Sequence, residues 1–180
     1  TVSSLPADAR NLPSGLKAPQ RITHQKKLAG VEDDVRFFLE AASALDGKLG
    51  PLLFQLPPWS RVDAQKLRGL LALIPRANRV ALEFRHESWM TEEIFALLRE
   101  HDAALCAADT DETADPDRVL VGTASWGYVR LRRSDYSDAA LDAWRDRIAQ
   151  QSWSEAWVFF KHEEEGKGPA FANRFKARPA

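Results

Sequence analysis

Glu83, Arg85 and His86 form the densest group of potentially reactive side chains in this sequence. Glu83 and Arg85 are two residues apart in the run RVALEFR, so on a β-strand they project from the same face. A carboxylate beside a guanidinium and an imidazole could serve as a general base or a metal ligand while Arg85 or His86 holds the substrate. Trp89 could stack on that substrate. Alternatively, Glu83 and Arg85 form an internal ion pair and His86 is simply solvated.

Asp109 follows the apolar run ALCAA and is the next acidic residue at a predicted strand end. If it lies on the same rim as Glu83, the two carboxylates could divide acid and base roles. They could also bind a divalent metal for a metal-assisted hydrolase or isomerase, with His86 and His162 nearby. The alternative is that Asp109 only begins a turn. The acidic segment 162–165 favours a solvated loop, so we assign no metal ligand and identify no cofactor.

Basic side chains lie near several predicted strand ends, although the formal net charge is only −1. This distribution predicts a localised pocket for a small anion, phosphate or carboxylate, rather than a broadly positive surface for nucleic acid. In the alternative, each cation pairs with a neighbouring acid and covers the core. The predicted binding side chains are Lys17, Arg85, Arg130 and Lys161, with His24, Gln55 and Tyr136 as hydrogen-bonding partners.

Short apolar runs alternate with segments of helical period, which is typical of βα units. Strands are predicted at residues 52–56, 79–84, 104–108, 128–131 and 156–160, with a weaker one near Leu16. Apolar residues at helical spacing predict helices over 31–45, 67–74, 91–98 and 137–148. The sequence therefore predicts the α/β class.

Several strands carry charge on one face near their carboxyl ends, as in RVALEFR and YVRLR. Strands buried on both faces usually consist of continuous apolar runs. A (β/α) barrel explains the difference, because one strand face meets the helices and the other fills an interior that ends in a polar rim. A doubly wound open sheet is the alternative.

Composition limits the class of protein. The 180 residues, 44% of them hydrophobic, are enough for one domain with its own core. Cys106 is the single cysteine and has apolar neighbours, so a buried thiol and a cytoplasmic location are expected. No apolar run is long enough to span a membrane, and the first residues do not resemble a signal peptide. The chain lacks GxxxxGK[ST], GxGxxG, GxSxG and CxxC motifs, which disfavours P-loop, hydrolase-elbow and thiol redox functions.

Six segments at the predicted strand ends occur in a fixed order: KAPQRITH, LGPLLFQLPP, ALEFRHESW, the Asp109 region, WGYVRLR…DY and FFKHEEEGKGP. Together, over about residues 15–175, they resemble the DUF72 family of YecE-like proteins. The resemblance implies a TIM-type barrel without an established activity. A full barrel needs ~250 residues, so an incomplete barrel of about six of eight strands is expected. Residues 1–14 are then a remnant or poorly ordered segment, and 15–180 form a single domain.

The resemblance places the glycine-containing loop 165–169 after the eighth strand, where barrels often bind phosphate. Proline suits the first turn of a helix, and Gly166 and Gly168 let backbone amides turn toward an anion. A flexible acidic turn is the alternative. We expect an enzyme with a strand-end pocket for a small anionic or phosphorylated substrate, or else a noncatalytic, truncated anion-binding module. Unpaired sheet edges also predict self-association.

Overall fold

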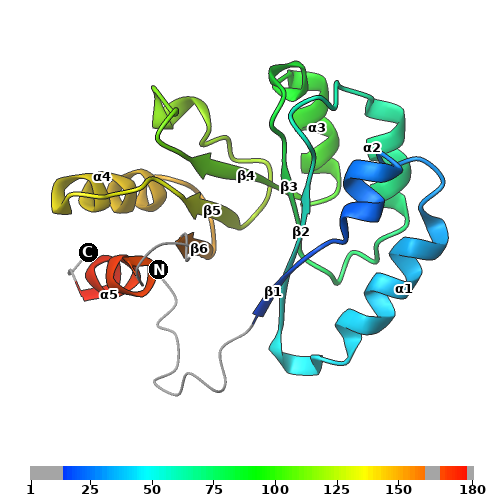
Figure 1. The fold of residues 1–180 in the computed structure, drawn as a ribbon, viewed down its shortest axis with the longest axis horizontal. Helices are drawn as coiled ribbons and strands as arrows, with labels where there is room; N and C mark the ends of the chain where they lie inside the picture. The colour runs from blue at the N-terminus through cyan, green and yellow to red at the C-terminus, as the bar shows by residue number, and fades with distance from the viewer. Residues whose placement is uncertain (1–13, 161–166, 178–180) are drawn as a thin grey trace. The chain divides into compact units, whose positions relative to one another are not determined.

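The structure is a computed structural model that describes residues 14–160 and 167–177 (Figure 1). The described chain divides into two compact units: an N-terminal unit of residues 14–104 and a C-terminal unit of residues 105–177. No helix in the described ranges is both long and apolar enough to cross a membrane. Each unit is considered by itself below.

Three parallel strands with helices between them make up the N-terminal unit. Its elements in order are β1 (Ser14–Lys17), the π-helical turn η2 (Arg21–Gln25), α1 (Glu32–Ser43), η3 (Asp46–Lys48), β2 (Leu49–Gln55), α2 (Ala64–Ala72), β3 (Val80–Glu83), η4 (Glu87–Trp89) and α3 (Glu92–Glu100). In β1–β3 neighbouring strands pair in parallel, with Leu16 opposite Leu52 and Leu52 opposite Val80. The three α-helices lie on one side of these strands (Figure 1).

The described part of the C-terminal unit also has three strands, but only a short 3-10 turn lies between its first two. Its elements are β4 (Ala104–Asp109, whose first residue marks the boundary), η5 (Pro116–Arg118), β5 (Gly127–Leu131), α4 (Asp138–Ala149), β6 (Ala156–Phe160) and α5 (Lys167–Ala177). β4 pairs in parallel with β5, and β5 with β6. A core of Val129, Leu131, Leu141, Trp144 and Phe171 joins these strands to α4 and α5.

The expected α/β class is confirmed: six parallel strands in βα succession are consistent with an incomplete TIM-type barrel. Local chemistry explains the helix starts. The Thr91 hydroxyl accepts a hydrogen bond from the Ile94 amide at the start of α3, and Ser137 does the same for Ala140 at the start of α4, as N-caps do. The expected division into residues 1–14 and one domain of 15–180 stays a prediction.

Candidate functional site

Four side chains that the sequence singled out meet at the carboxyl ends of β1, β2 and β3. Lys17 Nζ donates to Gln55 Oε1 at 2.7 Å, and Gln55 Nε2 donates to Glu83 Oε1 at 2.7 Å. Arg85 Nε donates to the same Glu83 oxygen at 3.2 Å. Glu83 is 1% exposed, whereas the Arg85 side chain is 33% exposed. These four residues, the Glu83 network, place a buried carboxylate beneath two cations that reach solvent.

Strand register produces this arrangement. Gln55 lies opposite Glu83, and Lys17 lies opposite Leu53, two residues before Gln55 and therefore on the same face. The alternate residue Phe54 points the other way, where its ring meets that of Phe38 in α1 at 5.9 Å. The Glu83 network thus occupies the face of the N-terminal sheet away from α1, as the alternation of polar and apolar residues predicts.

His24 lies beside the Glu83 network on the turn η2. The Lys26 amide bonds to the Arg21 carbonyl at 2.9 Å, five residues back, which defines a π-helical turn. Burial, followed by the nearby Lys17 and Arg85 cations, lowers the pKa of His24 below its ordinary value of 6.5. The imidazole is therefore neutral near pH 7, and one of its nitrogens can accept a proton while the other donates.

His86 and Trp89 take local structural positions after β3. The Nδ1 atom of His86 accepts the Ser88 amide at 3.1 Å and caps the turn η4. Trp89 is buried, stacks on Phe84 at 4.5 Å and donates its indole N–H to the Ser60 carbonyl at 2.7 Å. Trp89 thus makes a packing contact with the loop after β2, and its expected ligand-stacking role stays a prediction.

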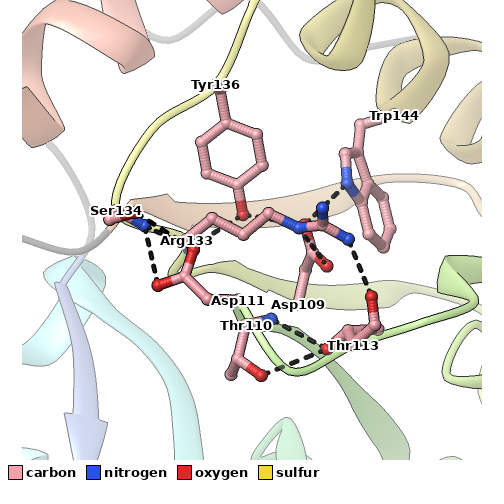
Figure 2. Close-up of polar contacts among 8 residues, drawn as sticks. All are labelled: Asp109, Thr110, Asp111, Thr113, Arg133, Ser134, Tyr136 and Trp144. Carbon is pink, nitrogen blue, oxygen red and sulfur yellow. Dashed lines mark hydrogen bonds and ion pairs between the residues drawn. The ribbon is translucent and has the colours of Figure 1, made fainter.

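Asp109 lies in the C-terminal unit at the end of β4 and is 0% exposed. Figure 2 shows the donors around its carboxylate: Arg133 Nε is 2.9 Å from both oxygens, Tyr136 OH donates to Oδ2 at 2.8 Å, and Trp144 Nε1 donates to Oδ2 at 3.0 Å. Burial, together with the hydrogen bond to Asp109, raises the pKa of Tyr136, so its hydroxyl remains a donor. These four residues are the Asp109 cluster.

The strand face on which Asp109 lies differs from the expected one. Asp109 pairs with Leu131 and Ala107 with Val129, so Asp109 shares the face that packs against α4, where its partner Trp144 lies. The residues of the opposite face are Ala108 and Arg130. The alternation in ALCAAD already contained this information, because Asp109 is an even number of residues from the core residue Ala107.

Sequence reasoning missed Arg133 and the hydrogen bond from the Trp144 indole to Asp109. The Arg133 guanidinium donates not only to Asp109 but also to the Thr113 carbonyl, at 3.0 Å. The amide of the neighbouring Ser134 donates to the Asp111 carboxylate at 3.0 Å (Figure 2). The Asp109 cluster therefore ties the loop after β5 to the loop after β4. A signal was present in the pair Arg132-Arg133, since one arginine of two adjacent ones after a strand can turn inward.

The other expected binding residues divide between described and undescribed parts of the chain. Arg130 is half-buried on β5, and Gly168 is buried in the first turn of α5. Lys161 and Gly166 lie outside the described residues, as does His162. Within the described residues, no three His, Cys, Asp or Glu side chains are grouped closely enough to hold a metal ion.

Comparison with known proteins gives a family and a fold. The family model described as "Protein of unknown function DUF72" matches residues 11–180. A DUF72 family protein from Thermotoga maritima MSB8 has a similar structure, with a TM-score of 0.78 and 23% identity, over 91% of this chain and 72% of that one. A DUF72 family protein from Enterococcus faecalis V583 has a TM-score of 0.72 and 16% identity, over 89% of this chain and 72% of that one. None of the curated proteins matches the sequence.

Proposed function

Because this chain belongs to the DUF72 family, whose function is unknown, we propose a function from its own geometry: the Glu83 network is the binding site of a small anionic substrate, on which Glu83 acts as a general base. One observation carries the proposal. A carboxylate that is 1% exposed is held by Gln55 and Arg85 at the carboxyl ends of three parallel strands. That end of the strands is where barrel enzymes place their reactive groups.

The Arg85 guanidinium has donors left to bind a ligand. Among the described residues Arg85 bonds only through Nε, which leaves its two terminal nitrogens as donors. A guanidinium presents such donors as a planar fork that matches a phosphate or a carboxylate. Lys17 adds a second positive charge and Glu83 contributes one negative charge. The terminal nitrogens of Arg85 therefore favour an anionic ligand.

The neutral His24 extends the site toward solvent. Its lowered pKa comes partly from Lys17 and Arg85, so an anion that screens these two cations would make His24 easier to protonate. Binding of an anion and uptake of a proton by His24 are then coupled. Such an imidazole can return a proton to the substrate after Glu83 has removed one, which is the proton balance that an isomerase requires.

A noncatalytic anion-binding module is the second candidate. It is favoured by the fact that Glu83 Oε1 already accepts from both Gln55 and Arg85, so the carboxylate could serve only to orient these donors. In this role Glu83 holds the guanidinium in place and never exchanges a proton with the ligand.

Titration with inorganic phosphate, followed by amide chemical shifts, tests the binding site. We expect Arg85→Ala and Lys17→Ala each to weaken phosphate binding by about tenfold, the loss of one charge-assisted contact. Arg36→Ala, which removes an exposed cation from α1 of the same unit, is the matched control and should bind as the wild type does. Equal affinity in all three variants would refute the site.

Glu83→Gln separates the enzyme from the binding module. The variant keeps the size of the side chain, so phosphate should still bind. With a panel of small phosphomonoesters and carboxylates, an enzyme shows turnover that Glu83→Gln abolishes. Absence of turnover by the wild type throughout the panel, with phosphate binding intact, would favour the module.

A further inference from the structure

A cleft of about 150 Å³ opens within the N-terminal unit, and one of its lining residues, Trp59, contacts His24. Its walls come from the segment after η2, the loop between β2 and α2, the first turn of α2, and Trp89. We call this the Trp59 cleft after its most exposed aromatic residue, which is 64% exposed. The residues that line it are Lys27, Leu28, Trp59, Ser60, Arg61, Val62, Asp63, Lys66 and Trp89.

Trp59 connects the cleft to the Glu83 network. Its ring contacts the edge of the His24 imidazole, with 6.1 Å between the ring centroids in a T-shaped arrangement. His24 in turn experiences the charges of Lys17 and Arg85. A ligand that stacks on Trp59 is therefore one ring contact away from His24, the residue whose pKa Lys17 and Arg85 lower.

Beside the cleft, Lys27 and Leu28 adopt the left-handed backbone conformation in which helical turns commonly end. Lys27 and Leu28 have φ values of 48° and 66°, and neither is a glycine. The Leu28 amide bonds to the Ile22 carbonyl at 3.0 Å and closes the end of the turn. Lys27 and Leu28 follow the π-helical turn that carries His24, and π-helical turns are frequent at functional sites.

The charges of the cleft also indicate its ligand. Lys27, Arg61 and Lys66 surround Trp59, and Asp63 is the one acidic lining residue, already paired with Lys66 at 2.8 Å. Across the described part of the chain, neither Lys27 nor Arg61 has a hydrogen bond or ion pair. The cleft thus combines an exposed indole face with cations that are not neutralised by the protein.

We propose that the substrate is a ring-bearing anion: its planar ring stacks on Trp59 in the cleft, and its phosphate or carboxylate group extends past His24 to Lys17 and Arg85. This inference rests on the anion site proposed above. The volume of the cleft limits the size of the ligand's ring, because pockets for drug-sized ligands measure roughly 300–1,000 Å³. A cleft of about 150 Å³ suits a single ring rather than a fused polycycle or a polymer.

Phenyl phosphate and inorganic phosphate are the probes, because they share the anionic group and differ in the ring. We expect the wild type to bind phenyl phosphate roughly three- to tenfold more tightly, the advantage of one stacked aromatic contact. Trp59→Ala should remove this advantage and leave the affinity for inorganic phosphate unchanged. Phe37→Ala, which deletes an aromatic ring that is 72% exposed on α1 outside the cleft, is the matched control and should keep the advantage.

The outcomes separate the two proposals. If phenyl phosphate has no advantage in the wild type, or keeps it in Trp59→Ala, the ring site is refuted while the anion site stands on inorganic phosphate alone. If the wild type binds neither probe, or Arg85→Ala weakens neither, the anion site itself is refuted. The indole N–H resonance of Trp59, assigned with Trp59→Phe, should shift further with phenyl phosphate than with inorganic phosphate.

Discussion

Asp109→Ala should destabilise the C-terminal unit more than Tyr136→Phe, which removes one of its hydrogen-bond partners. The substitution leaves the Tyr136 hydroxyl and the Trp144 indole N–H buried without their acceptor. Each buried donor left unsatisfied costs about 1–3 kcal/mol, so the two together cost about 2–6 kcal/mol. The Arg133 contribution is small by comparison, because its side chain is 33% exposed and water can replace the carboxylate.

Tyr136→Phe is the matched control, because it removes only the hydroxyl and keeps the ring that packs edge-on against Phe171 at 5.6 Å. It removes one donor to Asp109 and one acceptor for the Arg133 amide, and should cost about 0.5–2 kcal/mol. In the Asp109→Ala background the same change removes an unsatisfied donor. There Tyr136→Phe should cost nothing or stabilise the unit, which gives a coupling of about 1–2 kcal/mol in a double-mutant cycle.

Hydrogen exchange at the amides of β4 and β5 measures the free energy of unfolding where the Asp109 cluster lies, independently of the N-terminal unit. Urea unfolding followed by circular dichroism provides the second measurement. A loss below about 1 kcal/mol for Asp109→Ala, or equal costs of Tyr136→Phe in both backgrounds, would refute the reasoning from unsatisfied donors. A catalytic role for Asp109 would then be the better explanation of its position.

Three further predictions concern single residues. The folded chain lowers the pKa of His24 below 6.5, so the unfolded chain takes up the proton first as the pH falls. The stability that comes from keeping His24 neutral is therefore present above pH 6.5 and is lost as the pH falls below that value. Thermal melts of the wild type should therefore decline more than those of His24→Gln between pH 7.5 and 5.5, and parallel declines would contradict the assignment. Gly127→Ala should cost about 1–3 kcal/mol in urea unfolding, because its Cβ would lie 2.1 Å from the Trp153 ring, and Trp153→Ala should relieve the loss. Thr91→Ala should cost about 1 kcal/mol through the lost N-cap of α3, whereas Thr91→Ser should cost far less.

Much of the fold could be predicted because the strands have a strict period of two. The Glu83 network follows from three strands whose polar residues share a face. Alternation alone places the Gln55 side chain on the other face of the sheet from Phe54. The same rule, applied to ALCAAD, would have placed Asp109 on the helix side with Leu131. That error arose from treating every strand-end acid as a rim residue without counting its parity.

The Trp59 cleft could not be predicted by such counting. Two of its features are the left-handed backbone of its lining residues Lys27 and Leu28 and the π-helical turn before them. Lysine and leucine do not favour a left-handed backbone, so the sequence does not indicate it. Arg133 was missed for a related reason: it lies beyond the end of β5, where strand alternation no longer specifies direction. Lys161, Gly166 and the expected self-association stay predictions.

The π-helical turn that carries His24 also bears on how this part of the protein can evolve. A π-helical turn contains one residue more than the α-helical turn it replaces, and each residue of an α-helix advances the chain by about 100° around the axis. Deleting one residue between Arg21 and His24 would therefore swing the imidazole round the helix axis while β1 and β2 keep their pairing. Deletion of one codon would thus re-aim the His24 imidazole, which would change the ligand preference of the proposed site without any change to the sheet.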